Sequence, residues 1–220
     1  MKKISIVIPT YNEQDNIGLL VECLKRKMKE ELSDYIYDVI IIDNDSKDDT
    51  RKIILELCKK NKNVRAIFNS KNFGQFNSPY YGLCQATGDC AILLCADFQD
   101  PLDMIPKLVA EWENGYRIVC GVKTKSKENP ILRFLRTCYY KSIKRMSNVE
   151  IIEHFTGFGL YDKSFLDIMR DLDDPSPFLR GVVAEFGSKI KQIHYLQEKR
   201  RAGKSSFNLL SYYEAAMLSI

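Results

Sequence analysis

Short apolar runs alternate with amphipathic stretches along the first 122 residues of the chain. The runs are rich in Ile, Val and Leu, which is typical of strands buried on both faces. In the stretch after the first run, Ile17, Leu20, Leu24 and Met28 recur at roughly helical spacing. The pattern predicts strands at residues 4–9, 37–43, 64–69, 89–96 and 116–122.

The amphipathic stretches predict helices at residues 14–32, 50–61, 74–87 and 104–115. A basic helix is predicted at 131–146, and the residues after it are less regular. Repeated β-α alternation predicts one α/β domain over residues 1–220, with an open, mostly parallel sheet flanked by helices on both faces. In such sheets, ligands bind outside the carboxyl ends of the strands.

Composition narrows the class of protein. With 45% hydrophobic and 28% charged residues, the chain is typical of a globular domain rather than a disordered one. A net charge of +4 is too small to indicate nucleic acid, but it suits an anionic substrate or an acidic membrane surface. The seven cysteines form no C-x-x-C pair, which favours a reducing cytosol over a zinc site or a disulfide framework. No secretory signal is present, and no apolar run reaches the roughly 18 residues that a spanning helix needs.

Polar residues follow each of the first four predicted strands. The loops read "PTYNE" from Pro9, "DNDS" from Asp43, "NSKNFG" from Asn69 and "ADFQD" from Ala96. Parallel connectivity would bring them together at one edge of the sheet, although such residues also serve as ordinary helix caps. The chain has no G-x-G-x-x-G or P-loop motif and no G-x-S-x-G elbow, which disfavours dinucleotide, P-loop and serine-hydrolase chemistry.

Four motifs occur in the order found in the inverting family 2 glycosyltransferases: "SIVIPTYNEQDNI", "VIIIDNDSKDDT", "KNFGQ…GLCQATGD" and "ADFQDP". The chain resembles the branch of that family that glycosylates polyprenyl phosphates, which includes dolichyl-phosphate mannose synthases and bacterial prenyl-phosphate glucosyltransferases. The similarity continues through "PFLRG" and "RRAGKSSF". The resemblance implies a GT-A fold, a nucleoside diphosphate sugar as donor and a divalent cation.

For the donor, the resemblance implies that the "PTYNE" loop holds base and ribose, with Tyr11 against the base and Glu13 near the ribose hydroxyls. An aromatic face and a carboxylate suit a nucleoside. Asp43 or Asn44 would contact the base edge, although many relatives have an acid at position 44. The full predicted donor set is Pro9, Tyr11, Glu13, Asp43, Asn44, Lys71, Asn72, Asp97, Arg200, Lys204 and Ser205.

"ADFQD" corresponds to the D-x-D motif of the family. Asp97 and Gln99 are the predicted ligands of Mg²⁺ or Mn²⁺, with donor phosphates and water completing the shell. Asp97 and Asp100 are the predicted catalytic residues. Cys95 stands where the family has its first acid, and a protonated thiol is a poor ligand for magnesium. We interpret Cys95 as a buried residue at a strand end.

A second departure lies in "HFTGFGLYDK", where Gly157 and Gly159 replace an acid and an arginine of the family. A hydroxyl acceptor would need a general base, whereas a phosphate monoester is already anionic at neutral pH. The loss of the acid therefore favours a lipid phosphate as acceptor. Asp100, Glu153 and His154 are alternative bases, and each is also explained as a cap or a surface residue.

Two basic segments are candidates for binding phosphate. In "RRAGKSS", the cations Arg200, Arg201 and Lys204 surround Gly203, which suits a loop that closes on a diphosphate, or alternatively a solvated run of charge. The helix at 131–146 could rest on a membrane and bind a lipid phosphate, or simply pack on the protein. The predicted acceptor-phosphate residues are Arg133, Arg136 and Arg180.

The sequence thus predicts a metal-dependent inverting hexosyltransferase that moves a sugar from a UDP- or GDP-sugar to a polyprenyl phosphate at the cytoplasmic face of the cell membrane. The apolar end, residues 215–220, predicts a chain that stops before membrane helices. No nucleic acid partner is expected, and homo-oligomerisation is left open. Two alternatives remain: a glycosyltransferase acting on a soluble sugar or protein hydroxyl, and a nucleotide-sugar binding protein without turnover.

Overall fold

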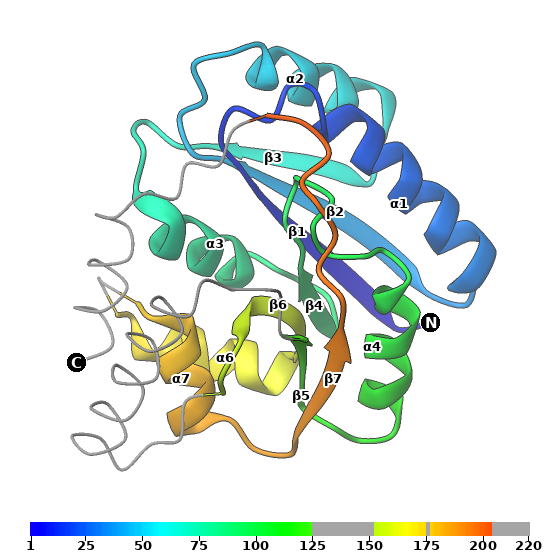
Figure 1. Ribbon diagram of the computed structural model, residues 1–220, viewed down its shortest axis with the longest axis vertical. Helices are drawn as coiled ribbons and strands as arrows, with labels where there is room; N and C mark the ends of the chain where they lie inside the picture. The colour runs from blue at the N-terminus through cyan, green and yellow to red at the C-terminus, as the bar shows by residue number, and fades with distance from the viewer. Residues whose placement is uncertain (125–151, 175–176, 204–220) are drawn as a thin grey trace.

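The computed structural model describes residues 1–124, 152–174 and 177–203, which form a seven-stranded sheet with helices on both faces (Figure 1). The order across the sheet is β3-β2-β1-β4-β6-β5-β7. The strands are β1 (Lys3–Thr10), β2 (Ile36–Asp43), β3 (Val64–Phe68), β4 (Cys90–Leu93), β5 (Ile118–Lys123), β6 (Phe155–Asp162) and β7 (Ile190–Tyr195). The described helices are α1 (Ile17–Glu31), α2 (Thr50–Lys60), α3 (Gly74–Cys84), α4 (Met104–Glu113), α6 (Lys163–Leu172) and α7 (Leu179–Phe186).

Alternating side chains of β1 divide the core between the two faces of the sheet. Successive strand residues point to opposite faces. Ile4, Ile6 and Ile8 lie in the core that also holds the buried residues of α1, α2 and α4, whereas Val7 lies in the core with α3, α6 and α7. Each fully buried aliphatic side chain stabilises the fold by about 1.5–3 kcal/mol. Both faces are therefore covered, which explains the nearly continuous apolar run that predicts this strand.

The first half of the sheet is parallel, as predicted. β1 pairs in parallel with β2 and β4, and β2 pairs in parallel with β3. β6 is antiparallel to both β4 and β5, and β7 is parallel to β5. The sheet is thus mostly parallel, with β6 as the reversed strand. The sequence predicted no strand at β6 or β7 and no helix at α6 or α7.

Two predicted boundaries are wrong at the edge of the sheet that carries the loops. The helix predicted from residue 14 begins at Ile17, because Ser46 in the next loop and Thr50 at the start of α2 bind the amides of Asn12 and Glu13. The strand predicted to reach residue 96 ends at Leu93, and the next residues turn so that the Cys95 amide donates to Asp100. Both corrections lengthen the loops at the carboxyl ends of the strands.

Across the described part of the chain, none of the helices has the length and apolar character needed to cross a bilayer. The predicted basic helix at 131–146 and the apolar segment at 215–220 lie outside the described residues.

Candidate active site

The loops after β1, β2 and β3 are joined by backbone hydrogen bonds at one edge of the sheet. Thr10 and Asp43, the last residues of β1 and β2, are partners in the ladder. The Asn44 amide donates to the Thr10 carbonyl at 2.9 Å, and the Asn69 amide donates to the Asp43 carbonyl at 2.9 Å. Parallel strands that end together therefore place these predicted loops side by side.

The first loop is shaped by Asn12, which adopts a left-handed conformation with φ 55°. Asparagine tolerates this region better than most residues. The Asn12 amide donates to Ser46 Oγ at 2.9 Å, and Asn12 Oδ1 accepts the Lys47 amide at 2.8 Å. The next amide, of Glu13, donates to Thr50 Oγ1 at 2.8 Å. These contacts with the second loop fix the backbone that carries the Glu13 carboxylate.

Glu13 is buried and its two carboxylate oxygens have different partners. Oε2 accepts the side-chain amide of Asn16 at 2.7 Å, and Oε1 forms an ion pair with Arg200 Nη2. Burial raises the pKa of Glu13, and the contacts with Asn16 and Arg200 act against that shift. A buried carboxylate is costly unless it is paired, so Arg200 offsets part of its desolvation.

Asp97, in the loop after β4, is only 8% exposed. Its Oδ1 accepts the Gln99 amide at 3.0 Å, and its Oδ2 lies 3.3 Å from Arg200 Nη1. The guanidinium of Arg200 therefore joins the carboxylates of Glu13 and Asp97, which come from the first and fourth predicted loops. This arrangement brings the two ends of the predicted site together.

Asp100 points into the protein rather than toward Arg200. It is 3% exposed, accepts the hydroxyl of Tyr195 at 2.6 Å on Oδ1, and accepts the Cys95 amide at 3.4 Å on Oδ2. Burial raises the pKa of Asp100 above its ordinary value, whereas the Tyr195 hydrogen bond and the charge of Lys123 act in the opposite direction. The Asp100 side chain thus supports the loop that carries Asp97.

Cys95 corrects one interpretation of the sequence. It is exposed, not buried, because the chain leaves the sheet after β4 and turns outward. Desolvation by the protein atoms around the thiol, together with the carboxylates of Asp100 and Asp97, raises the Cys95 pKa well above its ordinary value. The thiol is therefore protonated at neutral pH, as the sequence predicted, and a soft, neutral group stands in the loop that carries the predicted oxygen ligands Asp97 and Gln99.

Asp43 and Asn44, at the end of β2, have contrasting environments. Asp43 Oδ2 pairs with Arg51 Nε at 2.5 Å, while Asp43 Oδ1 is buried with no hydrogen-bond partner among the described residues. Asn44 instead uses its side-chain amide fully within the protein, since Nδ2 donates to Asn72 Oδ1 and Oδ1 accepts the Phe73 amide. Asn44 therefore links two loops, and Asp43 is the residue with an acceptor to spare.

The remaining predicted donor residues lie at or near this edge. Pro9 and Tyr11 are partly buried at the end of β1 and just after it. Lys71 is exposed, with its ammonium 5.1 Å from the Phe73 ring, and Asn72 is exposed beside Asn44.

Other predicted residues are not brought to this edge by any described contact. Arg180 lies in the first turn of α7, with its guanidinium 4.8 Å from the ring of Phe178. Glu153 is exposed. Lys204, Ser205, Arg133 and Arg136 lie outside the described residues.

Gly157 and Gly159 both lie on β6 in tightly packed positions. Gly157 has φ 103°, a region that side-chain-bearing residues rarely adopt, and its carbonyl accepts the Tyr161 hydroxyl at 2.5 Å. A Cβ added at Gly159 would overlap the carbonyl oxygen of Val119 on β5. The two departures from the family pattern are therefore built into the packing of this strand.

Sequence reasoning missed Arg51, Asn16 and Tyr195. Arg51 follows Asp43 by eight residues and lies in the first turn of α2. An acid before a helix and a cation in its first turn were a weak signal for this ion pair. Asn16 is three residues from Glu13, a spacing that suits a local contact. Tyr195 had no signal, because it reaches Asp100 from β7, a strand that the sequence did not predict.

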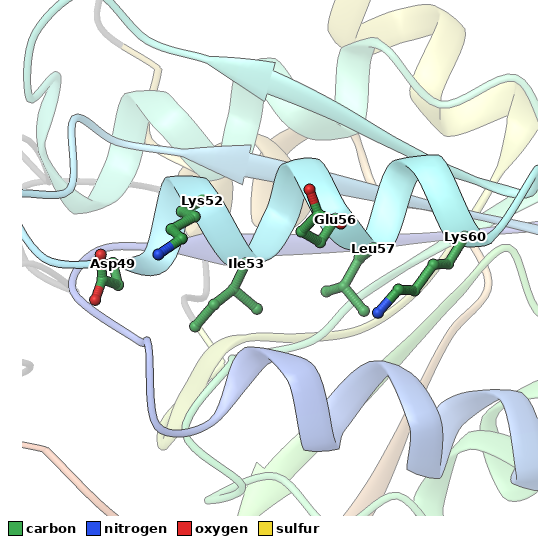
Figure 2. Close-up of a pocket in the computed structure, with 6 residues that line it drawn as sticks. All are labelled: Asp49, Lys52, Ile53, Glu56, Leu57 and Lys60. Carbon is green, nitrogen blue, oxygen red and sulfur yellow. The ribbon is translucent and has the colours of Figure 1, made fainter.

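A separate depression runs along α2 (Figure 2). Its volume is about 290 Å³, and it is lined by Asp49, Lys52, Ile53, Glu56, Leu57 and Lys60. None of the predicted donor, metal or acceptor residues lines this depression.

Comparisons with known proteins show the family and the fold of the chain. Residues 5–169 match the family model described as Glycosyl transferase family 2. The prophage bactoprenol glucosyl transferase homolog of Escherichia coli (strain K12) is 29% identical over 219 residues, which cover 99% of this chain and 71% of that protein. The bactoprenol glucosyl transferase of Shigella phage SfX is 28% identical over 219 residues, again with 99% of this chain and 71% of that protein covered.

Among solved structures, the chain is similar to glucosyl-3-phosphoglycerate synthase from Mycobacterium tuberculosis in complex with Mn²⁺, UDP and phosphoglyceric acid. The TM-score is 0.64 at 15% sequence identity, with 98% of this chain and 75% of that chain covered. This likeness confirms the GT-A fold that the sequence resemblance implied. Because the family model matches three quarters of the sequence, the chain belongs to glycosyl transferase family 2.

Proposed function

We propose that the chain transfers a sugar from a nucleoside diphosphate sugar to a polyprenyl phosphate, with inversion at the anomeric carbon. The observation that carries the proposal is the convergence of Glu13, Asp97 and Arg200 at the carboxyl edge of the sheet. The choice of a polyprenyl phosphate is supported by the two relatives named as bactoprenol glucosyl transferases.

The donor's nucleoside would occupy the first two loops. Asp43 Oδ1 is a buried acceptor with no partner among the described residues, which suits a base N–H such as those of uracil or guanine. Tyr11 would lie against the base and Glu13 would accept the ribose hydroxyls. The phosphates would face the cationic side of the site, with Arg200 and Lys71 as described candidates. Asn72, Lys204 and Ser205 complete the proposed donor set.

The residues present fit a divalent cation beside the diphosphate. Asp97 is a buried carboxylate whose Oδ2 already faces a cationic group, and Gln99 follows two positions later in the same loop. Hard oxygen ligands of this kind suit Mg²⁺ or Mn²⁺. When bound, the cation would neutralise charge on the departing diphosphate. The similar M. tuberculosis enzyme was solved in complex with Mn²⁺, which supports a divalent ion of this type.

The acceptor would supply its own nucleophile. Gly157 leaves no carboxylate at the family's acid position, and the carboxylate of Asp100 is held by Tyr195 inside the protein. A hydroxyl acceptor would lack a base there, whereas a phosphate monoester carries an anionic oxygen at neutral pH. Direct attack of that oxygen on the anomeric carbon inverts its configuration. Asp97 would then hold the cation beside the donor, and Asp100 would support the loop that carries Asp97.

The acceptor's phosphate would meet basic residues, with Arg180 as the described candidate and Arg133 and Arg136 as further proposals. Such residues suit a lipid phosphate presented at the cytoplasmic surface of a membrane. A membrane surface is accordingly the proposed place of the reaction.

Transfer assays test the proposal. The purified chain would be incubated with UDP-glucose or GDP-mannose, Mn²⁺ and undecaprenyl phosphate in detergent, and the lipid product identified by mass spectrometry. NMR of the anomeric proton would report inversion. The expected result is a glycosylated lipid phosphate, lost on Asp97→Asn and retained on Asp103→Asn, an exposed acid that pairs with Lys27.

Two outcomes would overturn it. Transfer to a soluble sugar or a protein hydroxyl in lipid-free buffer would assign a different acceptor. Tight donor binding without release of UDP or GDP would instead indicate a nucleotide-sugar binding protein, the alternative favoured by the neutral thiol of Cys95 beside Asp97.

A further inference from the structure

The segment after β7, residues 196–203, crosses the carboxyl edge of the sheet, and we call it the strap. Figure 1 shows it in orange, running from β7 past the ends of β4 and β1 toward α2. Its backbone binds the loop after β4, because the Glu198 amide donates to Gln99 O at 3.1 Å and the Arg201 amide donates to Asp97 O at 3.3 Å. The strap therefore lies directly on the loop that carries the predicted metal ligands.

The strap also binds the loop after β1. Asn16 Nδ2 lies 3.3 Å from the Ala202 carbonyl, and Arg201 Nη1 donates to the Asp15 carbonyl at 2.8 Å. Arg201 contacts no carboxylate in these interactions, and its guanidinium lies 5.8 Å from the Phe98 ring. The strap thus bridges the first and fourth loops by hydrogen bonds to backbone carbonyls.

Arg200 adds the charged contact to this bridge. Its guanidinium pairs with both Glu13 and Asp97, and its Nε donates to the Ala202 carbonyl at 2.9 Å. Gly203 has φ 81°, and a Cβ placed there would lie 3.4 Å from Arg200 Nη2, so the turn folds closely over the guanidinium. The guanidinium is consequently held from the strap side as well as by the two carboxylates.

These two carboxylates are the ones that a donor complex would need. In the proposed function Glu13 accepts the ribose hydroxyls and Asp97 binds the divalent cation. A guanidinium and a divalent cation on the same carboxylate repel each other at short range. Asn16 donates to Glu13 Oε2 and Arg200 pairs with Oε1, so a ribose hydroxyl would have to share this carboxylate with Arg200.

We propose that Arg200 is an electrostatic latch. Its guanidinium lies between Glu13 and Asp97, where it holds the strap closed over the loops and competes with a divalent cation for Asp97. Binding of the cation releases Arg200 from Asp97 and loosens the strap, and the guanidinium is then free to meet the diphosphate of the donor. The inference rests on the proposed function only in assigning Asp97 to the cation and Glu13 to the donor.

Mn²⁺ titration of the full chain, without donor, tests the competition. Arg200→Gln removes the competing cation, and Arg201→Gln is the matched control, because it removes the same charge and a strap contact but no partner of Asp97. We expect Mn²⁺ to bind Arg200→Gln about tenfold more tightly than the wild type. The affinity of Arg201→Gln should stay within about twofold of the wild type. Equal affinities for the two variants, or weaker binding by Arg200→Gln, would overturn the latch.

Hydrogen exchange provides a second readout that needs no activity. The amides of Glu198 and Arg201 should exchange faster in the wild type and in Arg201→Gln when Mn²⁺ is added, because Arg200 is released from Asp97. In Arg200→Gln their exchange should be fast already and unchanged by Mn²⁺. Exchange in the wild type that does not respond to saturating Mn²⁺ would contradict the proposal.

The two proposals fail separately. If the Mn²⁺ and exchange results hold but no sugar is transferred to lipid phosphate, the latch stands and the proposed reaction falls. If lipid phosphate is glycosylated but Arg200→Gln binds Mn²⁺ no better than Arg201→Gln, the reaction stands and the latch falls.

Discussion

The buried carboxylates at the candidate site are stabilised in two different ways. Glu13 and Asp97 share the positive charge of Arg200, whereas Asp100 receives its short hydrogen bond from the neutral hydroxyl of Tyr195. A hydrogen bond from a neutral donor offsets the desolvation of a carboxylate less than an ion pair does. Burial raises the pKa of Asp100, and the hydrogen bond from Tyr195 offsets only part of that shift.

Tyr195→Phe should therefore destabilise the protein in a pH-dependent way. It leaves one buried oxygen of Asp100 without a donor, at a cost of about 1–3 kcal/mol in the free energy of unfolding. The hydrogen bond lowers the Asp100 pKa, so its loss moves the folded-state pKa further above the ordinary value of 3.8. When folding raises the pKa of a carboxyl group, its contribution to stability is fully present at pH values below the unfolded-state pKa. That contribution is lost as the pH rises through the folded-state pKa.

The cost of Tyr195→Phe should accordingly grow as the pH rises above the ordinary Asp100 value of 3.8 toward neutrality, as measured by urea unfolding. Tyr35→Phe is the control, since the Tyr35 hydroxyl also donates to a carboxylate, that of Glu113, but at the surface. It should cost no more than about 0.5 kcal/mol. A Tyr195→Phe penalty that is constant with pH would show that Asp100 does not titrate as proposed.

Cys95→Asp tests whether the thiol weakens the cation site. The substitution restores a hard, charged ligand two positions before Asp97, so Mg²⁺ affinity should rise about tenfold, measured by calorimetry. Without metal, the new carboxylate would lie near those of Asp97 and Asp100. The melting temperature should therefore fall, because like charges repel. Cys95→Ser is the control that adds oxygen without charge. If Cys95→Asp bound Mg²⁺ no more tightly than Cys95→Ser, position 95 would not belong to the cation site.

A site residue could be predicted from the sequence when its position follows from the order of the strands, but not when its contact comes from a distant segment of the chain. Glu13, Asp43 and Asp97 could be predicted because each lies at the end of a strand or in the loop after it, and parallel strands bring such positions together. Tyr195 could not, because its contact with Asp100 spans 95 residues and depends on a strand with no clear pattern. Asn44 was predicted to contact the base because it lies in the loop after β2. In the folded protein its side-chain amide binds the loop after β3.

Among the elements, β6 is the strand that gives the sheet its mixed character. It pairs antiparallel with β4 and β5, and Gly159 allows β5 to approach closely. Gly157 and Gly159 interrupt the apolar run that would otherwise mark residues 155–162 as a strand, and glycine is unfavourable in strands by propensity alone. Tertiary packing against two neighbours overrides that propensity here, which is why the sequence did not predict the strand.

Gly159→Ala should destabilise the fold by about 1–3 kcal/mol, because its methyl group would overlap the Val119 carbonyl and separate β5 from β6. Gly18→Ala is the matched control: it lies in α1, and a Cβ there would be 3.8 Å from the nearest atom, on Ile53. Alanine favours helix over glycine, so this variant should be as stable as the wild type or more so. Thermal unfolding of both variants measures the difference. Similar stabilities would contradict the close β5–β6 packing.

At the scale of the whole molecule, two helical layers hold the sheet and leave its carboxyl edge to loops and the strap. The helices α1, α2 and α4 cover one face and α3, α6 and α7 cover the other, so the strands that position Asp43 and Asp97 are fixed from both sides. The loops themselves rely on hydrogen bonds and ion pairs. A ligand that joins several of these loops should therefore stabilise the whole chain, because it adds contacts that the unfolded state lacks.

A nucleoside diphosphate sugar together with Mn²⁺ should raise the melting temperature by more than either alone. At about 100 times its dissociation constant a ligand adds about 2.7 kcal/mol to the free energy of unfolding. For a chain of this size each kcal/mol shifts the melting temperature by about 2–4 °C, so the expected increase is about 5–10 °C.

The melting temperatures with UDP-sugars and with GDP-sugars at equal concentration would then be compared. The larger increase would identify the base from which Asp43 accepts a hydrogen bond. Asp97→Asn should lose the Mn²⁺-dependent part of the shift while keeping a smaller response to nucleotide, because the loops that hold the nucleoside are joined to each other without Asp97. If Mn²⁺ and a donor sugar together shifted Asp97→Asn as much as the wild type, Asp97 would not hold the cation, and the site would have to be sought elsewhere on the sheet.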